Sequence, residues 1–376
     1  MEEKSSTVKK AATVVAKEEA QSVGLRYSND LQAGYVRKKK GDGFVYLDKN
    51  GKLIKDKETL ERIASIVIPP AWREVWICPY KNGHIQATGR DVRGRKQYRY
   101  HAKWRAVRDE TKFHHMLLFA RALPRIRRRV TKDIKRKDKP LQRVLATIIK
   151  LLETTLIRVG NDEYARLNGS YGLTTMRKRH VKIKGSEISF SFRGKSGKKH
   201  QISMEDRQVA RIVKKCQELP GQELFSYQDE AGKVHDIGSN DVNNYLKEIS
   251  GESFTAKDFR TWAGTVMAAL ALKEFESVTS EVQAKKNIVA AIETVSSLLG
   301  NTPSVCRKCY VHPEILNSYL EGNTIETISQ RIKPNLPQLR QLHADEAAVF
   351  VLLQRRLKRI KKAAGQNNRV KASKGK

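Results

Sequence analysis

Apolar and polar residues alternate over the first hundred positions in a way that is typical of strands. Gly43–Leu47 (GFVYL) reads as a strand, and residues 48–51 (DKNG) read as the hairpin turn that follows it. Residues 74–79 and 85–90 are two more strand candidates, whereas Ile66–Ile68 runs into a Pro-Pro pair that stops regular pairing. The pattern predicts a β-rich domain over residues 24–104.

From His101 onward the apolar spacing becomes helical, as in Leu141–Val159, where apolar side chains recur every three to four positions. Gly300 is a helix-terminating signal, and residues 239–241 resemble an N-cap region. Two strands interrupt the helices, at 181–192 and 200–203, with a turn at 194–197 between them. Helices are expected at 115–130, 141–159, 204–219, 241–248, 257–275, 280–299 and 343–364.

These elements predict an α+β protein with a small β-rich N-terminal domain and a larger, mainly α-helical domain that holds a small β-sheet. The larger domain is expected over residues 105–325. Residues 1–23 lack a continuous apolar stretch and are expected to form a flexible extension rather than a secretory signal. Residues 326–376 are expected to contain a C-terminal helix and a basic tail.

The charge balance indicates a polyanionic partner. The 376 residues include 74 Lys and Arg against 40 Asp and Glu, a net charge of +34. Such self-repulsion favours nucleic acid as the partner, and no apolar run reaches the roughly 20 residues that cross a bilayer. The tail from Arg355 to Lys376 has ten basic residues and no acidic one, so it either binds phosphates without sequence preference or is simply solvated.

The cysteines favour neither a disulfide framework nor a zinc site. There are four, and Cys306 and Cys309 form a single C-x-x-C with His312 as the one extra candidate ligand nearby. A structural zinc ion normally takes four ligands, so two reduced thiols on a short helical turn are the favoured interpretation. No G-x-x-x-x-G-K-[ST] run is present, which argues against ATP-driven chemistry.

A set of residues further along the chain suits the cleavage of a nucleic-acid strand without a metal. That reaction needs a nucleophile for phosphorus, cations for the non-bridging oxygens and an acid for the leaving oxygen. Tyrosine, arginine and lysine suit these three tasks in turn. The chain offers them in order as Arg158, Lys195 at the hairpin turn, Arg260 in a K-x-x-R-T run, then Asn301 and Tyr310.

This order resembles the active site of the type IB DNA topoisomerases. The stretch from Gly89 to Tyr98 (GRDVRGRKQY) is similar to a G-R-D-x-x-G-R-K-Q-Y segment of that family's N-terminal domain, and the resemblance spans about residues 25–325. Viral and eukaryotic members of the family carry histidine where this chain has Asn301, and this departure resembles the family's bacterial branch. The resemblance implies two lobes clamped around duplex DNA.

The resemblance also implies a role for each residue. Tyr310 would form a 3′-phosphotyrosyl link and expel a 5′-hydroxyl, Arg158 and Arg260 would hold the scissile phosphate, Lys195 would protonate the leaving oxygen, and Asn301 would donate to a non-bridging oxygen. Gln97, Tyr98, Tyr100 and Tyr164 match DNA-contacting positions. The implied enzyme relaxes positive and negative supercoils, requires no metal or nucleotide cofactor, acts as a monomer and lies in the cytoplasm with the nucleoid.

Two other functions stay open at this point. A tyrosine recombinase shares the nucleophile, the arginines and the lysine, but usually has H-x-x-R where this chain has Lys257 three residues before Arg260. A non-catalytic architectural protein explains the charge and the tail but not the ordered set of reactive residues. Taken singly, each arginine is most often a surface charge, Tyr310 a packing residue and Lys195 a turn residue.

Overall fold

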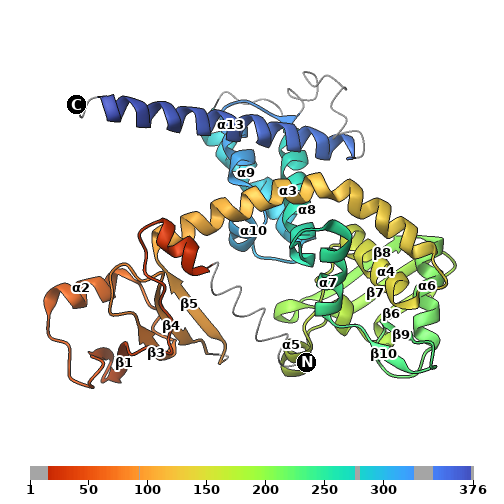
Figure 1. Cartoon of the computed structure of the whole chain (residues 1–376), viewed down its shortest axis with the longest axis horizontal. Helices are drawn as coiled ribbons and strands as arrows, with labels where there is room; N and C mark the ends of the chain where they lie inside the picture. Colours follow the sequence, from red (N-terminus) through yellow and green to blue (C-terminus); the bar gives the residue numbers. More distant parts are fainter. Residues whose placement is uncertain (1–15, 93, 276–279, 326–341, 374–376) are drawn as a thin grey trace. The chain divides into compact units, whose positions relative to one another are not determined.

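The computed structural model describes residues 16–92, 94–275, 280–325 and 342–373, with the backbone alone at 109–110 and 360–373. The chain divides into two compact units, Met1–His114 and His115–Lys376. The division falls inside one long helix, α3 (Ala102–Lys135). Both units mix helices with antiparallel sheet, which confirms the expected α+β class (Figure 1).

The first unit is built on one five-stranded antiparallel sheet in the order β2-β1-β3-β4-β5. Its apolar core lies between the sheet and helix α2, where Ile63 packs with Val75, Ile77 and Ala87. The sheet confirms the strands expected at 43–47, 74–79 and 85–90. The elements are β1 (Tyr35–Lys40), β2 (Gly43–Leu47), α2 (Lys57–Ser65), β3 (Arg73–Ile77), β4 (Ile85–Arg90) and β5 (Lys96–Tyr100).

The N-terminal extension is shorter than its composition predicts. Residues 16–22 form a helical segment, and Ala20 is fully buried against Leu25 and Trp104. The alanines at positions 16 and 20 lie one helical turn apart, which gives this short helix an apolar side despite its charge. Residues 1–15 of the expected extension lie outside the described residues.

The second unit holds a three-stranded sheet, β6-β7-β8, and a separate two-stranded one, β9-β10. Residues 181–192 were expected to be one strand, but they form two, because Gly185 turns the chain at φ +63°. The strands are β6 (Val181–Lys184), β7 (Glu187–Arg193), β8 (Lys199–Glu205), β9 (Ser226–Gln228) and β10 (Val234–Asp236), with 3-10 turns η1 (Leu173–Thr175), η2 (Lys178–His180) and η3 (Lys195–Gly197).

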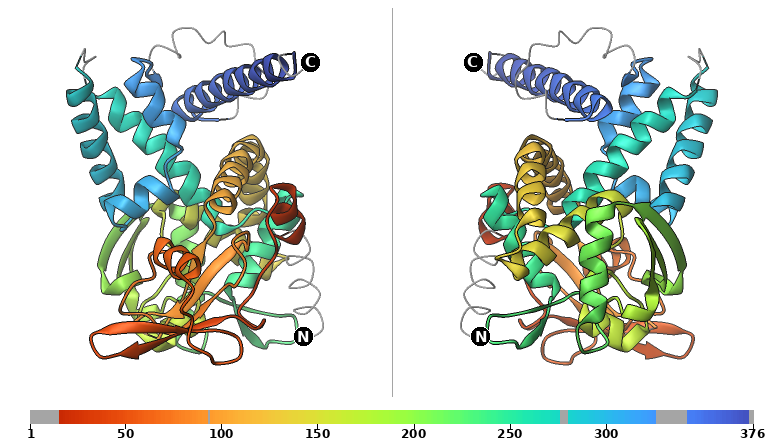
Figure 2. Two further views of the ribbon diagram at one scale, coloured as in Figure 1. Left: turned by 90° about the vertical axis from the view of Figure 1, so that its left-hand side faces the viewer. Right: turned by 90° about the vertical axis from the view of Figure 1, so that its right-hand side faces the viewer.

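Helices form most of the second unit, with α8 at the centre of the packing. It contacts α4, α7, α9, α11 and α13, and Figure 2 shows α9 running beside it while α6 lies against the three-stranded sheet. The bounds are α4 (Pro140–Thr155), α5 (Asp162–Asn168), α6 (Arg207–Glu218), α7 (Ser239–Ser250), α8 (Ala256–Lys273), α9 (Glu281–Leu298), α10 (Pro303–Cys309), α11 (Pro313–Leu320) and α13 (Ala344–Ser373).

Several expected helix boundaries were wrong. The helix expected over residues 115–130 spans Ala102–Lys135, and two others differ for a local reason. The helix expected to reach Val159 ends at Thr155, because Leu156 takes a left-handed conformation with φ 55°. The helix expected from Met204 begins at Arg207, because β8 extends to Glu205 and Asp206 caps the helix. The last helix runs beyond Ala364 to Ser373, whereas residues 326–341 and 374–376 of the expected C-terminal segment lie outside the described residues.

Candidate active site

Arg158 lies on an extended segment just beyond the end of α4. Its carbonyl accepts from Leu173 N at 2.9 Å, and the next carbonyl, that of Val159, accepts from Thr174 N at 2.7 Å. Gly160 closes the segment at φ +110°, where a Cβ would lie 2.8 Å from Thr174 Oγ1. The backbone of Arg158 is thus held against η1, which orients its half-buried side chain.

Arg260 is 4% exposed and lies in the second turn of α8. Its guanidinium donates to the carbonyl of Leu156 at the end of α4 and, at 2.6 Å, to Leu299 O at the end of α9. Helix C-termini carry partial negative charge, so these carbonyls partly compensate the cation. Burial, followed by repulsion from Arg158, lowers the pKa of Arg260 to about 10, which leaves it charged at neutral pH.

Asn301 follows the end of α9, where Gly300 reverses the chain at φ +61° and Asn301 N donates to Ser296 O at 2.9 Å. The Asn301 side-chain oxygen accepts from an Arg158 Nη2 that also lies 3.4 Å from Gly300 O. Asn301 Nδ2 is left buried without a hydrogen-bond partner, and Arg260 Nε is also buried without one. Buried donors without acceptors are unfavourable, so the two atoms indicate where an anionic oxygen belongs.

Tyr310 is the C-cap residue of α10, and its N–H donates to Cys306 O at 2.9 Å. Thr265 of α8 fixes the turn that follows, since its hydroxyl donates to Tyr310 O and accepts from His312 N, both at 3.1 Å. Gly264 permits the close approach, because a Cβ there would lie 2.9 Å from Tyr310 O. The Arg260 guanidinium carbon lies 5.4 Å from the centre of the Tyr310 ring.

Lys195 begins the η3 turn between β7 and β8, as the sequence predicts. Within the described residues, its ammonium has no hydrogen-bond or ion-pair partner. Ser196 and Gly197 both take positive φ, at 64° and 76°, so the turn is tight. The position of the Lys195 amine therefore depends on how the hairpin itself is held.

A cavity of about 580 Å³ gathers most of the predicted catalytic residues: Arg158, Lys195, Arg260 and Tyr310 all line it, together with Tyr164. Asn301 does not line it but is joined to it through Arg158. Lys257 and Ala256, at the N-terminus of α8, complete the basic wall, and no lining residue is acidic. A helix N-terminus and four cations make this cavity suited to a phosphate.

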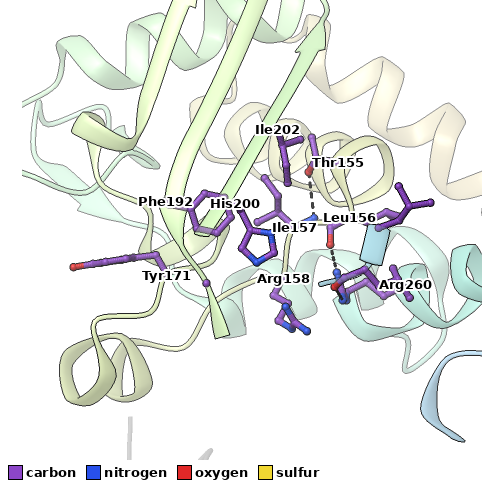
Figure 3. A pocket seen from close by; sticks show the side chains of 12 residues that line it. Thr155, Leu156, Ile157, Arg158, Tyr171, Phe192, His200, Ile202 and Arg260 are labelled. Atoms are coloured by element: carbon purple, nitrogen blue, oxygen red, sulfur yellow. Dashed lines mark hydrogen bonds between the residues drawn. The ribbon is translucent and has the colours of Figure 1, made fainter. Parts of the chain in front are cut away.

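A smaller pocket adjoins this cavity and shares Arg158 and Arg260 with it. Figure 3 shows its lining, with His200 pointing toward Arg158 and a hydrogen bond joining Arg260 to the backbone of Leu156. Sequence reasoning missed His200, Gly264 and Thr265, and it used Lys257 only to distinguish two enzyme families. For Gly264 a signal existed, because a glycine inside a helix costs about 1 kcal/mol relative to alanine and so marks a close approach.

The other predicted DNA contacts lie on β5, the edge strand of the first unit. Tyr98 and Tyr100 are 42% and 39% exposed, and their rings stack with centres 5.8 Å apart. Gln97 lies on the opposite face of the strand, and its amide donates to Asp91 at 3.0 Å. The two tyrosines therefore form one aromatic surface that Gln97 does not share.

The cysteines are free thiols, as expected, and Cys306 and Cys309 both lie on α10. Burial raises the pKa of Cys306 to about 11. Over the described ranges no three His, Cys, Asp or Glu side chains gather in a way that could hold a metal ion. Among the helices of the same ranges, none has the length and apolarity to span a membrane.

The fold and the cavity thus define a basic two-unit protein in which a tyrosine and four cationic side chains line one cavity. Comparison with known proteins is in accord with this. The family described as "Eukaryotic DNA topoisomerase I, catalytic core" matches residues 101–336, and "Bacterial DNA topoisomerase IB, N-terminal domain" matches residues 43–91. The chain belongs to the type IB DNA topoisomerase family, and it is accordingly a DNA topoisomerase that binds DNA.

Curated relatives cover most of the chain. The DNA topoisomerase 1B of Acanthamoeba polyphaga mimivirus is 33% identical over 298 residues, which are 77% of this chain and 88% of the relative. The DNA topoisomerase 1B of vaccinia virus (strain Copenhagen) is 22% identical over 77% of this chain and 91% of its own length. The DNA topoisomerase 1 of Candida albicans is 25% identical over 76% of this chain but only 36% of its own length.

Proposed function

We propose that this protein relaxes supercoiled DNA by cutting one strand through Tyr310 and then rejoining it. The observation that carries the proposal is the cavity that brings Tyr310 together with Arg158, Arg260 and Lys195, and whose charged lining residues are all basic. The unpartnered donors Arg260 Nε and Asn301 Nδ2 support a phosphate ligand, since each lacks an acceptor that a non-bridging oxygen would supply.

In the cleavage step the Tyr310 oxygen attacks phosphorus and the bond from phosphorus to the 5′ oxygen breaks. Tyr310 loses its proton to solvent, and Lys195 gives a proton to the departing 5′ oxygen. Arg158, Arg260 and Asn301 donate to the non-bridging oxygens, where negative charge grows. Rejoining is the reverse: the 5′-hydroxyl attacks the 3′-phosphotyrosyl bond, the tyrosine leaves, and Lys195 takes the proton back.

The proposed enzyme takes duplex DNA as its substrate, with the two units clamped around it, and requires no nucleotide or metal cofactor. The phosphotyrosyl bond keeps the energy of the broken phosphodiester, and the torque of supercoiling drives rotation of the free end. Such an enzyme would act as a monomer in the cytoplasm, on the nucleoid. Tyr98, Tyr100 and Tyr164 would contact the duplex, with Gln97 placed to contact it only after leaving Asp91.

The test is plasmid relaxation in EDTA without ATP, with wild type beside Tyr310→Phe. Wild type should relax negatively and positively supercoiled plasmid and leave a covalent adduct on the 3′ side of the nick. The phenylalanine variant should bind DNA with similar affinity but form no adduct. Relaxation by the variant would exclude Tyr310 as the nucleophile, and dependence on added Mg²⁺ or ATP would refute the cofactor-free reaction.

A further inference from the structure

His200 lies on β8, on the strand that leaves the Lys195 turn. Its ring stacks on Phe192, its cross-strand neighbour on β7, with ring centres 5.2 Å apart and planes inclined by 15°. Figure 3 shows the ring between Phe192 and the side chain of Arg158. His200 is therefore fixed on the hairpin and faces the catalytic arginines.

Two glycines enclose the His200 ring. A Cβ on Gly194 would lie 2.6 Å from His200 Cδ2, and a Cβ on Gly300 would lie 2.6 Å from His200 Cε1. Gly194 immediately precedes Lys195, and Gly300 immediately precedes Asn301. The imidazole thus fills the space between the hairpin that carries the candidate proton donor and the helix end that carries a phosphate ligand.

A second contact joins the same two segments. Lys198, at the other end of the hairpin turn, donates from Nζ to Asn301 O at 3.1 Å. A backbone hydrogen bond from Tyr171 N to Arg193 O, at 2.8 Å, holds the hairpin as well. Since the Lys195 ammonium has no partner of its own within the described residues, its position depends on these contacts. Burial, then Arg158, Arg260 and Lys198, lower the pKa of His200, so the ring fills the gap at neutral pH without adding a cation.

We propose that His200, packed between Gly194 and Gly300, is a positioning residue that holds the Lys195 hairpin in register with the scissile phosphate. The inference rests on the proposed function, in which Lys195 protonates the leaving oxygen. Its distinguishing consequence is chemical: loss of His200 should impair proton donation while leaving the phosphate held by Arg158 and Arg260.

Single-turnover cleavage of two duplexes tests this, at a cleavage site first mapped with wild type. One duplex carries the ordinary 5′-bridging oxygen, and the other carries sulfur at that atom, which leaves as a thiolate and needs no proton. On the oxygen duplex, His200→Ala should be slowed about 10- to 100-fold, less than the roughly 100- to 10,000-fold expected when a general acid is lost outright. On the sulfur duplex it should return to within a few-fold of wild type.

Lys195→Ala and Arg158→Ala are the two reference variants. The sulfur duplex should restore the cleavage rate of Lys195→Ala but not that of Arg158→Ala, because Arg158 acts on the non-bridging oxygens. Rescue of Lys195→Ala but not of His200→Ala would overturn the positioning role alone. Failure to rescue Lys195→Ala would overturn the proton-donor role of Lys195 and this inference with it, while absence of any adduct in wild type would overturn the proposed function itself.

Gly194→Ala tests the contact between Gly194 and the His200 ring without changing His200, in case His200→Ala folds poorly. Gly194 has φ −93°, which alanine adopts freely, so its effect would come from the new methyl pressing on the His200 ring. The variant should be slowed on the oxygen duplex and rescued by sulfur. Gly194→Ala/His200→Ala should be no slower than His200→Ala, and additive slowing would contradict the packing argument.

His235→Ala is the matched control. His235 also stacks on an aromatic ring of a neighbouring strand, that of Tyr227 at 5.3 Å, but it lies on the separate β9-β10 sheet. Its cleavage rates should equal those of wild type on both duplexes. Equal slowing of His200→Ala on both duplexes, like that of a generally loosened protein, would overturn the inference.

Discussion

Arg260 is a buried cation whose acceptors are carbonyl groups, and this makes Arg260→Met an informative substitution. Methionine keeps the length of the side chain and its apolar stem but removes the charge and the donors. The change deletes the hydrogen bonds to Leu156 O and Leu299 O, each at a helix end. It also removes the free-energy cost of burying a charged guanidinium, which has no carboxylate partner among the described residues.

The two effects on stability oppose each other. Hydrogen bonds from a charged donor stabilise by about 1.5–3 kcal/mol each, so two lost bonds cost about 3–6 kcal/mol. The lowering of the Arg260 pKa from 12.5 to about 10 corresponds to about 3 kcal/mol of unfavourable burial, which the neutral side chain recovers. The net loss of unfolding free energy should therefore be small, about 0–3 kcal/mol, while cleavage should fall by at least about 100-fold.

Urea unfolding followed by circular dichroism measures the first quantity, and single-turnover cleavage measures the second. Arg211→Met, at an exposed position on α6, is the matched control and should change neither. Duplex DNA should stabilise wild type more than Arg260→Met, because the phosphate supplies the missing anion. A loss above about 5 kcal/mol in the free protein, or cleavage at the wild-type rate, would refute the view that Arg260 is held ready for a phosphate.

Three more predictions follow from contacts around the site. Thr265→Val should lose about 1–3 kcal/mol of unfolding free energy and slow cleavage, because it frees Tyr310 O and His312 N; thermal melting and adduct formation measure both, and an unchanged cleavage rate would contradict it. Glu346→Gln should cost about 3 kcal/mol in urea unfolding, since Glu346 binds both Arg127 and Trp262. Burial would raise the pKa of Glu346, but its contacts with Arg127 outweigh burial and hold the pKa below its ordinary value of 4.5. The stabilisation from Glu346 is thus present above pH 4.5 and lost as pH falls below it, so melting curves should show a larger acid loss for wild type than for Glu346→Gln. Oxidation of Cys306 and Cys309 to a disulfide should strain the helix before Tyr310 and slow cleavage, and equal activity of oxidised and reduced protein, with the bond verified by mass spectrometry, would refute it.

Much of the fold was predictable wherever the apolar pattern and the turn chemistry agree. The Gly43–Leu47 strand, the Lys195 turn and the end of α9 at Gly300 all combine a periodic segment with a glycine beside it. Some elements that the pattern missed bury few apolar side chains. In α2 only Ile63 is buried, although Asp56 caps the helix by accepting from Thr59 N.

Strand β1 shows a different failure. Its buried side chain is Arg37, which is 8% exposed and donates to Pro69 O at 3.0 Å and to Trp72 O at 2.7 Å. Arg37 thereby holds the loop that follows Pro69. Because this polar side chain points into the core, the alternation of polar and apolar residues in the sequence suggests the wrong buried face for β1. Alternation cannot reveal a strand whose core-facing residue is an arginine, because the carbonyls that satisfy it lie more than thirty residues away.

In the candidate site, too, some residues could be predicted from the sequence and others could not. The ordered arginines, lysine and tyrosine were recognisable because chemistry limits which residue types can hold a phosphate or attack it. Their supports were not, because a support is defined by shape: Gly264 matters for the methyl it lacks beside Tyr310, and Gly194 and Gly300 for the space they leave to His200. Each of these glycines lies next to or opposite a reactive residue. In this protein the close approach of glycine backbone to the Tyr310 carbonyl and to the His200 ring sets the distances over which the reactive groups can act together.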